Sequence, residues 1–367
     1  MTDPRLKKLA DILVNYSVKV QPGDWVYINS SIVAVPLMNE VYKKVLQAGG
    51  NITSNIYTDD LQELYFLEAN NDQLDWVSPT VKQIYEQANV LISLRGAENT
   101  RALSGVAPKK QARRAQATRS LQETYMARSA TKDLRWVLTD FPCLAFAQDA
   151  DMSLSDFEDF VYAATYADTD DPVAEWTRIH TEQQKVVDWL KGKKTVTVKS
   201  PNADLTLSIE GRTFINADGE RNMPSGEVFT GPVEDSANGW VKYTYPAISG
   251  GREVEGIYLE FKDGKVVKAT AQKNEEFLLT QLDTDEGARY LGEFAIGTNY
   301  GIKRFTKSIL FDEKIGGSFH MALGAGYPET GSVNKSSIHW DMICDIREDS
   351  EIRVDGELLY KDGQFQI

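Results

Sequence analysis

The pattern of apolar residues changes near residue 192, and this change constrains the fold more than any other feature of the sequence. Before it, short apolar runs such as Asp24–Asn29, Asn51–Thr58 and Val90–Leu94 alternate with stretches of helical spacing. Strands that alternate with helices of about 10–15 residues are typical of βαβ units around a parallel sheet. After Gly192, apolar residues recur at every second position, as in antiparallel strands with one buried face.

Two domains are therefore expected, which also fits a length of 367 residues. Residues 1–192 should form an α/β domain with a largely parallel sheet. Residues 193–367 should form an α+β domain rich in antiparallel strands. Within the second domain three hairpins are predicted, and two of them turn at Asp-Gly pairs. The paired segments are Val196–Val198 with Leu205–Ile209, Gly256–Phe261 with Lys265–Thr270, and Val354–Tyr360 with Gln364–Ile367.

Charge and cysteine content exclude several classes of protein. The net charge of −14 disfavours binding to nucleic acid or to an acidic membrane surface. The basic stretch at residues 109–119 is interpreted as the solvated face of a helix. Two cysteines, Cys143 and Cys344, cannot make a disulfide framework. The N-terminal pattern is that of an amphipathic helix rather than a signal peptide, and no run approaches the roughly 18 apolar residues of a membrane span. We therefore expect a cytoplasmic protein that binds neither nucleic acid nor membrane.

The histidines point to the chemistry because there are only three. No dinucleotide fingerprint, P-loop, His-Glu-x-x-His or Gly-x-Ser-x-Gly motif occurs. His180 lies inside a predicted helix and is interpreted as an ordinary helix residue. His339 and Asp341 lie two residues apart on a predicted strand, so their side chains leave the same face. Such a pair binds a divalent metal or forms a His–Asp hydrogen bond, and the pair alone does not decide between them.

Three further polar residues lie in apolar strand patterns of the same half. His320 lies within Gly317–Leu323, Glu293 within Leu291–Gly297, and Glu227 between glycines and apolar residues. An ionised carboxylate in such surroundings is costly unless it is paired or ligates a metal. A salt bridge to Lys or Arg is the alternative for either glutamate taken alone.

These segments carry a resemblance to a known family. The chain resembles the thermophilic aminopeptidases, also called aminopeptidase T, S or PepS, which are M29 metallopeptidases. The resemblance covers essentially the whole chain and rests on four separated motifs, together with Trp136–Pro142 and Met152–Tyr162 in the first half. The four motifs are Gly226–Pro232 (GEVFTGP), Leu291–Asn299 (LGEFAIGTN), Asp312–Gly324 (DEKIGGSFHMALG) and Ile338–Met342 (IHWDM).

The resemblance implies a metal site, a catalytic residue and an assembly. The implied catalytic residue is Tyr327, and a homodimer is implied as well. The implied metal ligands are Glu227, Glu293, His320, His339 and Asp341. Five ligands without cysteine exceed the four of a closed structural zinc site and suit two metal ions. Nitrogen and oxygen donors admit Zn, Co, Mn or Mg, and the sequence does not rank them.

The predicted function is therefore a metal-dependent aminopeptidase. It would release N-terminal amino acids from peptides with a free N-terminus through a water activated by two divalent metal ions. Tyr327 would donate a hydrogen bond to the developing oxyanion. Glu227 or Glu293 would relay a proton, with Glu313 as a neighbouring partner. The alternatives are another two-metal hydrolase, either an amidase or a phosphoesterase, and less plausibly a non-catalytic metal-binding protein.

Overall fold

The computed structural model describes residues 3–249 and 251–367. It divides into two compact units, and each unit consists of two separate segments of the chain. Unit 1 comprises Met1–Trp176 and Gly219–Pro224, and unit 2 comprises Thr177–Asp218 and Ser225–Ile367.

Unit 1 is built around a five-stranded sheet in the order β2-β1-β3-β4-β8, in which all neighbouring strands are parallel. The strands are β1 (Trp25–Ser31), β2 (Asn51–Tyr57), β3 (Val90–Arg95), β4 (Arg135–Asp140) and β8 (Asn222–Met223). Val26, Ile28 and Ile92 are fully buried in them. The prediction of an α/β domain with a parallel sheet is confirmed.

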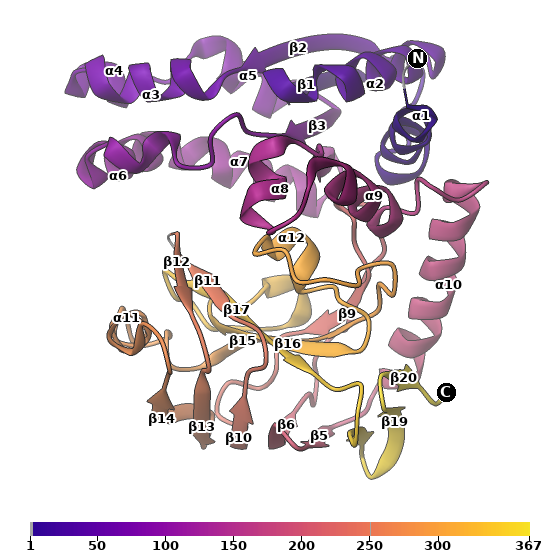
Figure 1. Ribbon diagram of the computed structural model, residues 1–367, viewed down its shortest axis with the longest axis vertical. Coiled ribbons are helices and arrows are strands. Elements are labelled where there is room, and N and C mark those ends of the chain that lie inside the picture. The colour runs from indigo at the N-terminus through magenta and orange to yellow at the C-terminus, as the bar shows by residue number, and fades with distance from the viewer. Residues whose placement is uncertain (1–2, 250) are drawn as a thin grey trace. The chain divides into compact units, whose positions relative to one another are not determined.

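Figure 1 shows the helices of unit 1 gathered around these strands. They are α1 (Pro4–Asp11), which continues as a π-helix over Ile12–Ser17, α2 (Val35–Gln47), α3 (Asp59–Glu68), α4 (Asn71–Asp75), α5 (Pro79–Gln87), α6 (Pro108–Ala117), α7 (Arg119–Ala130), α8 (Leu144–Asp149) and α9 (Leu154–Ala164).

The basic stretch at residues 109–119 forms α6 and the start of α7, but it is not simply a solvated face. Lys110 donates to the carbonyl groups of residues 66, 67 and 69, which end α3. Arg114 donates to two carbonyl groups at the end of α4, and Arg113 pairs with Asp75. Cations near helix C-termini satisfy the last carbonyl groups, so this part of α6 ties three helices together.

Unit 2 is a sandwich of antiparallel sheets. Its eight-stranded sheet has the order β14-β13-β10-β6-β5-β18-β19-β20, its five-stranded sheet has the order β17-β16-β15-β9-β7, and β11 and β12 form a short ribbon. The strands are β5 (Thr195–Ser200), β6 (Ala203–Ser208), β7 (Ile215–Ala217), β9 (Glu227–Thr230), β10 (Asn238–Lys242), β11 (Ala247–Ser249), β12 (Arg252–Val254), β13 (Tyr258–Lys262), β14 (Lys265–Thr270), β15 (Leu291–Gly297), β16 (Ser318–Gly324), β17 (His339–Asp345), β18 (Glu351–Val354), β19 (Glu357–Lys361) and β20 (Gln364–Phe365). The antiparallel prediction is confirmed.

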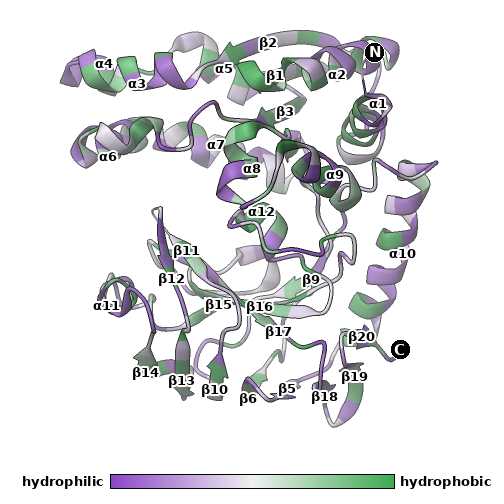
Figure 2. Ribbon diagram, in the orientation of Figure 1, coloured by the Kyte–Doolittle hydropathy of each residue, from purple (hydrophilic) through white to green (hydrophobic). Residues whose placement is uncertain are grey.

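One apolar core fills the space between the two larger sheets. Val198 and Leu205 contribute from the eight-stranded sheet, and Phe294, Met321 and Met342 contribute from the five-stranded sheet. The helices of this half are α10 (Pro172–Leu190), α11 (Glu275–Leu282) and α12 (Ile309–Asp312). Hydrophilic and hydrophobic residues alternate along α10, as expected of a helix with one buried face (Figure 2).

The division between the units differs from the boundary expected near residue 192. The spacing of apolar residues changes close to residue 192, because β5 begins at Thr195, whereas the units divide after Trp176 within α10. The reason is that Val186, Val187 and Leu190 of α10 are buried in the core of unit 2. The segment Gly219–Pro224 adds β8 to the edge of the parallel sheet, so unit 1 is not one continuous stretch of chain.

The hairpins at residues 195–208 and 258–270 form as predicted. The third predicted hairpin also forms, between β19 and β20 around Asp362 and Gly363. The expectation of one continuous strand over Val354–Tyr360 before it is wrong. That stretch contains a turn at Asp355 and Gly356, whose φ angles are 51° and 83°, and it forms the hairpin β18–β19. No helix in the described ranges combines the length and apolar character needed to cross a membrane.

Candidate metal centre

The five-stranded sheet of unit 2 has one apolar face and one face that carries the predicted site residues. Phe294, Met321 and Met342 point into the core from β15, β16 and β17. Because strand side chains alternate, their neighbours leave the opposite face. That face carries Glu227 on β9, Glu293 on β15, His320 on β16, and His339 and Asp341 on β17.

The register of the strands brings these residues together. Ala322 on β16 pairs with both Glu293 and Asp341, and Ala295 on β15 pairs with His320. The two alanines share the polar face with the site residues. Their small side chains leave space between the longer ones, which larger residues at these two positions would fill.

The closest atoms of the site form two groups that share one carboxylate. His320 Nε2 lies 3.4 Å from Glu227 Oε2 and 3.4 Å from Glu293 Oε1. His339 Nε2 lies 3.4 Å from Glu293 Oε2 and 3.5 Å from Asp341 Oδ1. Each oxygen of Glu293 therefore faces a different histidine, and each resulting group of three has the composition of a metal site.

These separations are those of metal ligands rather than of hydrogen bonds. Hydrogen bonds in proteins are mostly about 2.7–3.2 Å long. Two donor atoms that each lie about 2.1 Å from one tetrahedral ion stand about 3.4 Å apart. Glu227 Oε2, Asp341 Oδ1 and both ring nitrogens of His320 are buried without a hydrogen-bond partner in the described part of the chain. Buried polar atoms are rarely left unpaired, so the donor set fits a cation.

The ionisation of the site shows how strongly its groups interact. Burial raises the pKa of Glu227 to about 7, against the opposing charge of Lys314. Burial also raises the pKa of Glu293. Burial alone would lower the pKa of His320, but its contact with Glu293 and the charge of Glu227 raise it to about 9. In the metal-free protein, bound protons therefore compensate the negative charge of the carboxylates, as a bound cation would.

His339 and Asp341 form the other end of this network. Burial opposes the charged form of His339, yet the Asp341 carboxylate raises the pKa of His339 to about 10. Burial alone would raise the pKa of Asp341, but the charge of His339 outweighs it and lowers that pKa. His339 Nδ1 lies 2.7 Å from the carbonyl oxygen of Ala325. A proton held on Nδ1 by that carbonyl leaves Nε2 as the ligand atom.

Lys314 and Glu313 border the site. Lys314 is fully buried, pairs with Glu313, and lies 3.7 Å from Glu227 Oε1. The two oxygens of Glu227 therefore have different neighbours, Lys314 and His320. Glu313 also comes close to His320 and Asp341. The sequence identified Glu313 as a partner, but it gave no sign that Lys314 is buried.

Tyr327 follows β16 and lies against His339. Its ring centre is 5.3 Å from that of His339 and 5.5 Å from that of Phe229. The residue is 36% exposed. Burial of the phenol, together with the charges of Glu293 and Asp341, raises the pKa of Tyr327 well above its usual value. The hydroxyl is therefore protonated at neutral pH and can donate a hydrogen bond.

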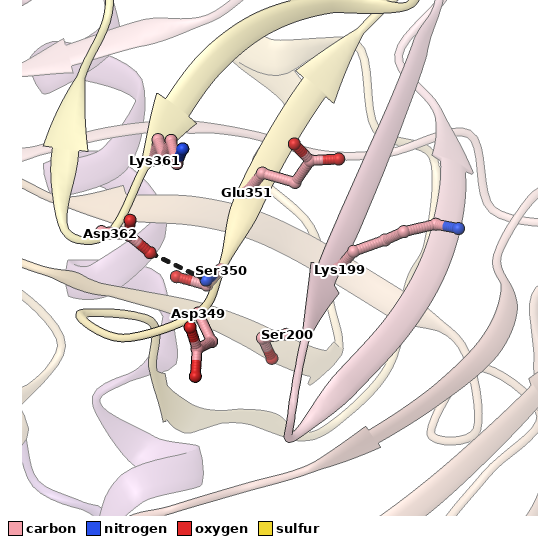
Figure 3. Close-up of a pocket in the computed structure, with 7 residues that line it drawn as sticks. All are labelled: Lys199, Ser200, Asp349, Ser350, Glu351, Lys361 and Asp362. Carbon is pink, nitrogen blue, oxygen red and sulfur yellow. Dashed lines mark hydrogen bonds between the residues drawn. The ribbon is translucent and has the colours of Figure 1, made fainter.

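Two other polar features of unit 2 lie apart from this cluster. A surface depression of about 530 Å³ is lined by residues such as Lys199, Glu351 and Lys361. Figure 3 shows these side chains on β5, β18 and β19. None of its lining residues belongs to the metal centre. His180 on α10, interpreted from the sequence as an ordinary helix residue, pairs with Asp218 at 2.5 Å and belongs to none of the groups of potential metal ligands among the described residues.

Comparison with known proteins decides the family. The family described as thermophilic metalloprotease (M29) matches residues 2–365. The chain belongs to this family. As an M29 member it is a metallo-aminopeptidase, a hydrolase that depends on a divalent metal. It is 28% identical to "Aminopeptidase 2" of Geobacillus stearothermophilus, over 99% of this chain and 95% of that protein.

Two solved structures share the fold of this M29 enzyme. Wild-type AmpT from Thermus thermophilus matches with a TM-score of 0.85 and 24% identity, over 99% of both chains. A 2,5-dihydroxypyridine dioxygenase from Pseudomonas putida KT2440 matches with a TM-score of 0.55 and 14% identity, over 98% of this chain and 96% of that one. Both likenesses concern the fold alone, and the second shows that a different chemistry uses it as well.

Proposed function

We propose that this M29 enzyme releases N-terminal amino acids from peptides with a free amino terminus, using two divalent ions. One ion would be held by Glu227, His320 and Glu293 Oε1, and the other by His339, Asp341 and Glu293 Oε2. The observation that carries this proposal is the position of Glu293, whose two oxygens face different histidines at 3.4 Å. Glu293 would therefore be the carboxylate that both ions share.

The charges of the site favour two ions over one. Glu227, Glu293, Glu313 and Asp341 supply four negative charges, and Lys314 supplies one positive charge. With neutral histidines these groups sum to −3, so one divalent ion would leave −1 in a largely buried site, whereas two ions together with one hydroxide would leave zero. Buried uncompensated charge is costly, so a second ion is expected.

The ions supply Lewis acidity, which polarises the scissile carbonyl and lowers the pKa of water. The chain's own residues complete the chemistry. Tyr327 donates a hydrogen bond to the oxygen on which negative charge develops. Glu293 would use both oxygens to hold the two ions, whereas Glu227 has only Oε2 directed at His320. We therefore assign the proton relay to the leaving amine to Glu227 Oε1, beside Lys314.

The acidic character of the site favours a protonated amino terminus as the substrate group it recognises. A phosphoesterase would need cations available for a phosphate, and Lys314 is already paired with Glu313 and lies next to Glu227. The peptidase therefore fits the site better than that alternative. A homodimer and a cytoplasmic location complete the proposal.

The experiment that tests the function uses chelated protein and aminoacyl-p-nitroanilides, with Co, Zn, Mn and Mg added back separately. Activity should disappear on chelation and return with a divalent transition metal. Peptides with a free N-terminus should be cut, and their N-acetylated counterparts should not. Full activity of metal-free protein would refute the metal site, and equal turnover of acetylated peptides would indicate the amidase instead.

A further inference from the structure

The connection between β16 and β17, residues 325–338, carries Tyr327 and ends at His339. We call it the β16–β17 loop. A connection of this length is expected to be mobile unless other parts of the chain hold it. The position of the Tyr327 hydroxyl therefore depends on what anchors this loop.

Glu234, in the connection between β9 and β10, provides such an anchor. Its Oε1 accepts hydrogen bonds from Ser332 Oγ at 3.0 Å and from the backbone N–H of Val333 at 2.7 Å. Its Oε2 accepts from Arg212 Nη2 at 2.6 Å. Arg212 Nη1 in turn donates to the carbonyl oxygen of Gly331. One carboxylate–guanidinium pair thus holds three consecutive loop residues.

A tight turn connects this anchor to Tyr327. Pro328–Thr330 form one turn of 3-10 helix, and both the N–H and the hydroxyl of Thr330 donate to the carbonyl oxygen of Tyr327, at 3.0 and 2.6 Å. The N–H of Thr213, the residue after Arg212, donates to the carbonyl oxygen of Thr330 at 3.0 Å. Movement of residues 331–333 would therefore be transmitted to Tyr327.

The loop also lies in close contact with the end of β9. A Cβ atom at Gly231 would come within 2.6 Å of Ser332 Cβ and 2.8 Å of Thr330 Oγ1. Glycine at this position allows the loop to approach the strand, and Glu234 lies three residues further along the same chain segment. The strand end and the carboxylate together fix the position of the loop.

We propose that Glu234, held by Arg212, is a positioning residue for Tyr327. It acts through the β16–β17 loop and does not belong to the metal centre. This inference rests on the role of Tyr327 in the proposed function. A hydroxyl displaced by about 1 Å from its productive position loses much of its effect on the transition state, with losses that reach about 100-fold.

The test is a double-mutant cycle on kcat. Glu234→Ala should lower kcat about 10- to 100-fold and leave KM and the bound metal unchanged. Glu234→Gln should recover part of the loss, because its amide oxygen can still accept from Val333. In a Tyr327→Phe background, Glu234→Ala should cost less than about threefold, since the hydroxyl it positions is already absent.

Glu351→Ala is the matched control. Glu351 also holds an arginine, Arg353, with two hydrogen bonds of 2.9 and 3.0 Å, but on β18 in the other sheet. This variant should keep the wild-type kcat. Amide exchange of residues 331–337 should speed up in Glu234→Ala and stay unchanged in Glu351→Ala.

Two results would overturn this proposal and leave the proposed function unaffected. One is an unchanged kcat in Glu234→Ala. The other is an equal loss in the wild-type and Tyr327→Phe backgrounds, because a general effect on folding would not depend on the hydroxyl. If Tyr327→Phe itself has the wild-type kcat, the role of Tyr327 in the proposed function fails, and the positioning role of Glu234 fails with it.

Discussion

At the residue scale, the site depends on how each carboxylate divides its two oxygens. Glu293 directs one oxygen to each histidine, whereas Glu227 directs one to His320 and the other towards Lys314. In the proposed function, these orientations make Glu293 the carboxylate shared by both ions and Glu227 a ligand of one ion. The sequence predicted both glutamates as site residues, but it could not distinguish their roles, because the direction of each carboxylate oxygen depends on the register of neighbouring strands.

The Tyr327 hydroxyl is predicted to act only in the transition state. Tyr327→Phe should therefore lower kcat about 10²–10³-fold, as for the loss of one oxyanion donor, while KM stays close to wild type. Bound metal should stay at the wild-type amount, since the phenol is not proposed as a ligand. Steady-state kinetics and metal analysis by mass spectrometry measure both quantities. Loss of metal in Tyr327→Phe would show that the residue has a different role.

The histidines predict how the metal-free protein responds to pH. The pKa of His320 is raised from 6.5 to about 9 and that of His339 from 6.5 to about 10, so the folded state binds protons more tightly than the unfolded state. This stabilisation is complete below about pH 6.5 and is lost as the pH rises towards 9–10. The pKa of Glu227 is raised from 4.5 to about 7. Its contribution to stability is therefore also lost as the pH rises, but over this lower range.

Thermal unfolding of chelated protein from about pH 6 to pH 10 should therefore show a falling Tm. The increase in Tm on adding metal should grow over the same range, because the metal replaces the protons. If the Tm of the metal-free protein rises from about pH 6 to pH 10, the raised pKa values of His320 and His339 are wrong.

At the element scale, most strands of both units could be predicted from the sequence, because the two-residue period is a local property. β15, β16 and β17 each show this period, so the polar face of each strand could be predicted together with the candidate ligands on it. The order of the strands is set by pairing between distant segments. Only that pairing shows that the small residues Ala295 and Ala322 lie beside the site residues on the polar face.

The sequence did not predict one turn and one loop contact of unit 2, and each omission has an identifiable physical cause. The Asp355-Gly356 turn carries the same signal as the other two Asp-Gly turns, but it lies inside a stretch that also fits one continuous strand. The anchoring of the β16–β17 loop by Glu234 left no trace in the sequence. Glu234 lies 98 residues before Ser332, and no local pattern links the two.

The two faces of β17 should respond differently to mutation. Met342 is fully buried on the core face, so Met342→Ala should lower the free energy of unfolding by about 2–5 kcal/mol. The proposed ligands His339 and Asp341 lie on the other face, and the folded variant should keep its metal. Denaturant unfolding and metal analysis of the same sample measure both effects. Metal loss without a measurable change in stability would mean that the two faces are not separate in this way.

At the scale of the whole molecule, fold and chemistry are only loosely linked. The dioxygenase from Pseudomonas putida KT2440 shares the fold at 14% identity, and one fold can support unrelated reactions. Membership of the M29 family, together with the donor set on one sheet, is what identifies this chain as a metallo-aminopeptidase.

The proposed homodimer is a prediction for the whole molecule. It comes from the family resemblance, and light scattering at micromolar concentration measures it directly. A dimer has twice the chain mass of 41.1 kDa. A measured mass equal to that of one chain would remove the dimer from the proposal and leave the metal centre unaffected, because all its proposed ligands belong to one unit of one chain.

The two-ion site that shares Glu293 is tested most directly by the number of metal ions bound per chain in wild type, His339→Ala and Glu293→Ala, measured by mass spectrometry after dialysis. We predict about two ions in wild type, about one in His339→Ala, and fewer than one in Glu293→Ala, because only Glu293 serves both positions. A single ion in wild type, or two ions retained in Glu293→Ala, would contradict the shared two-metal centre.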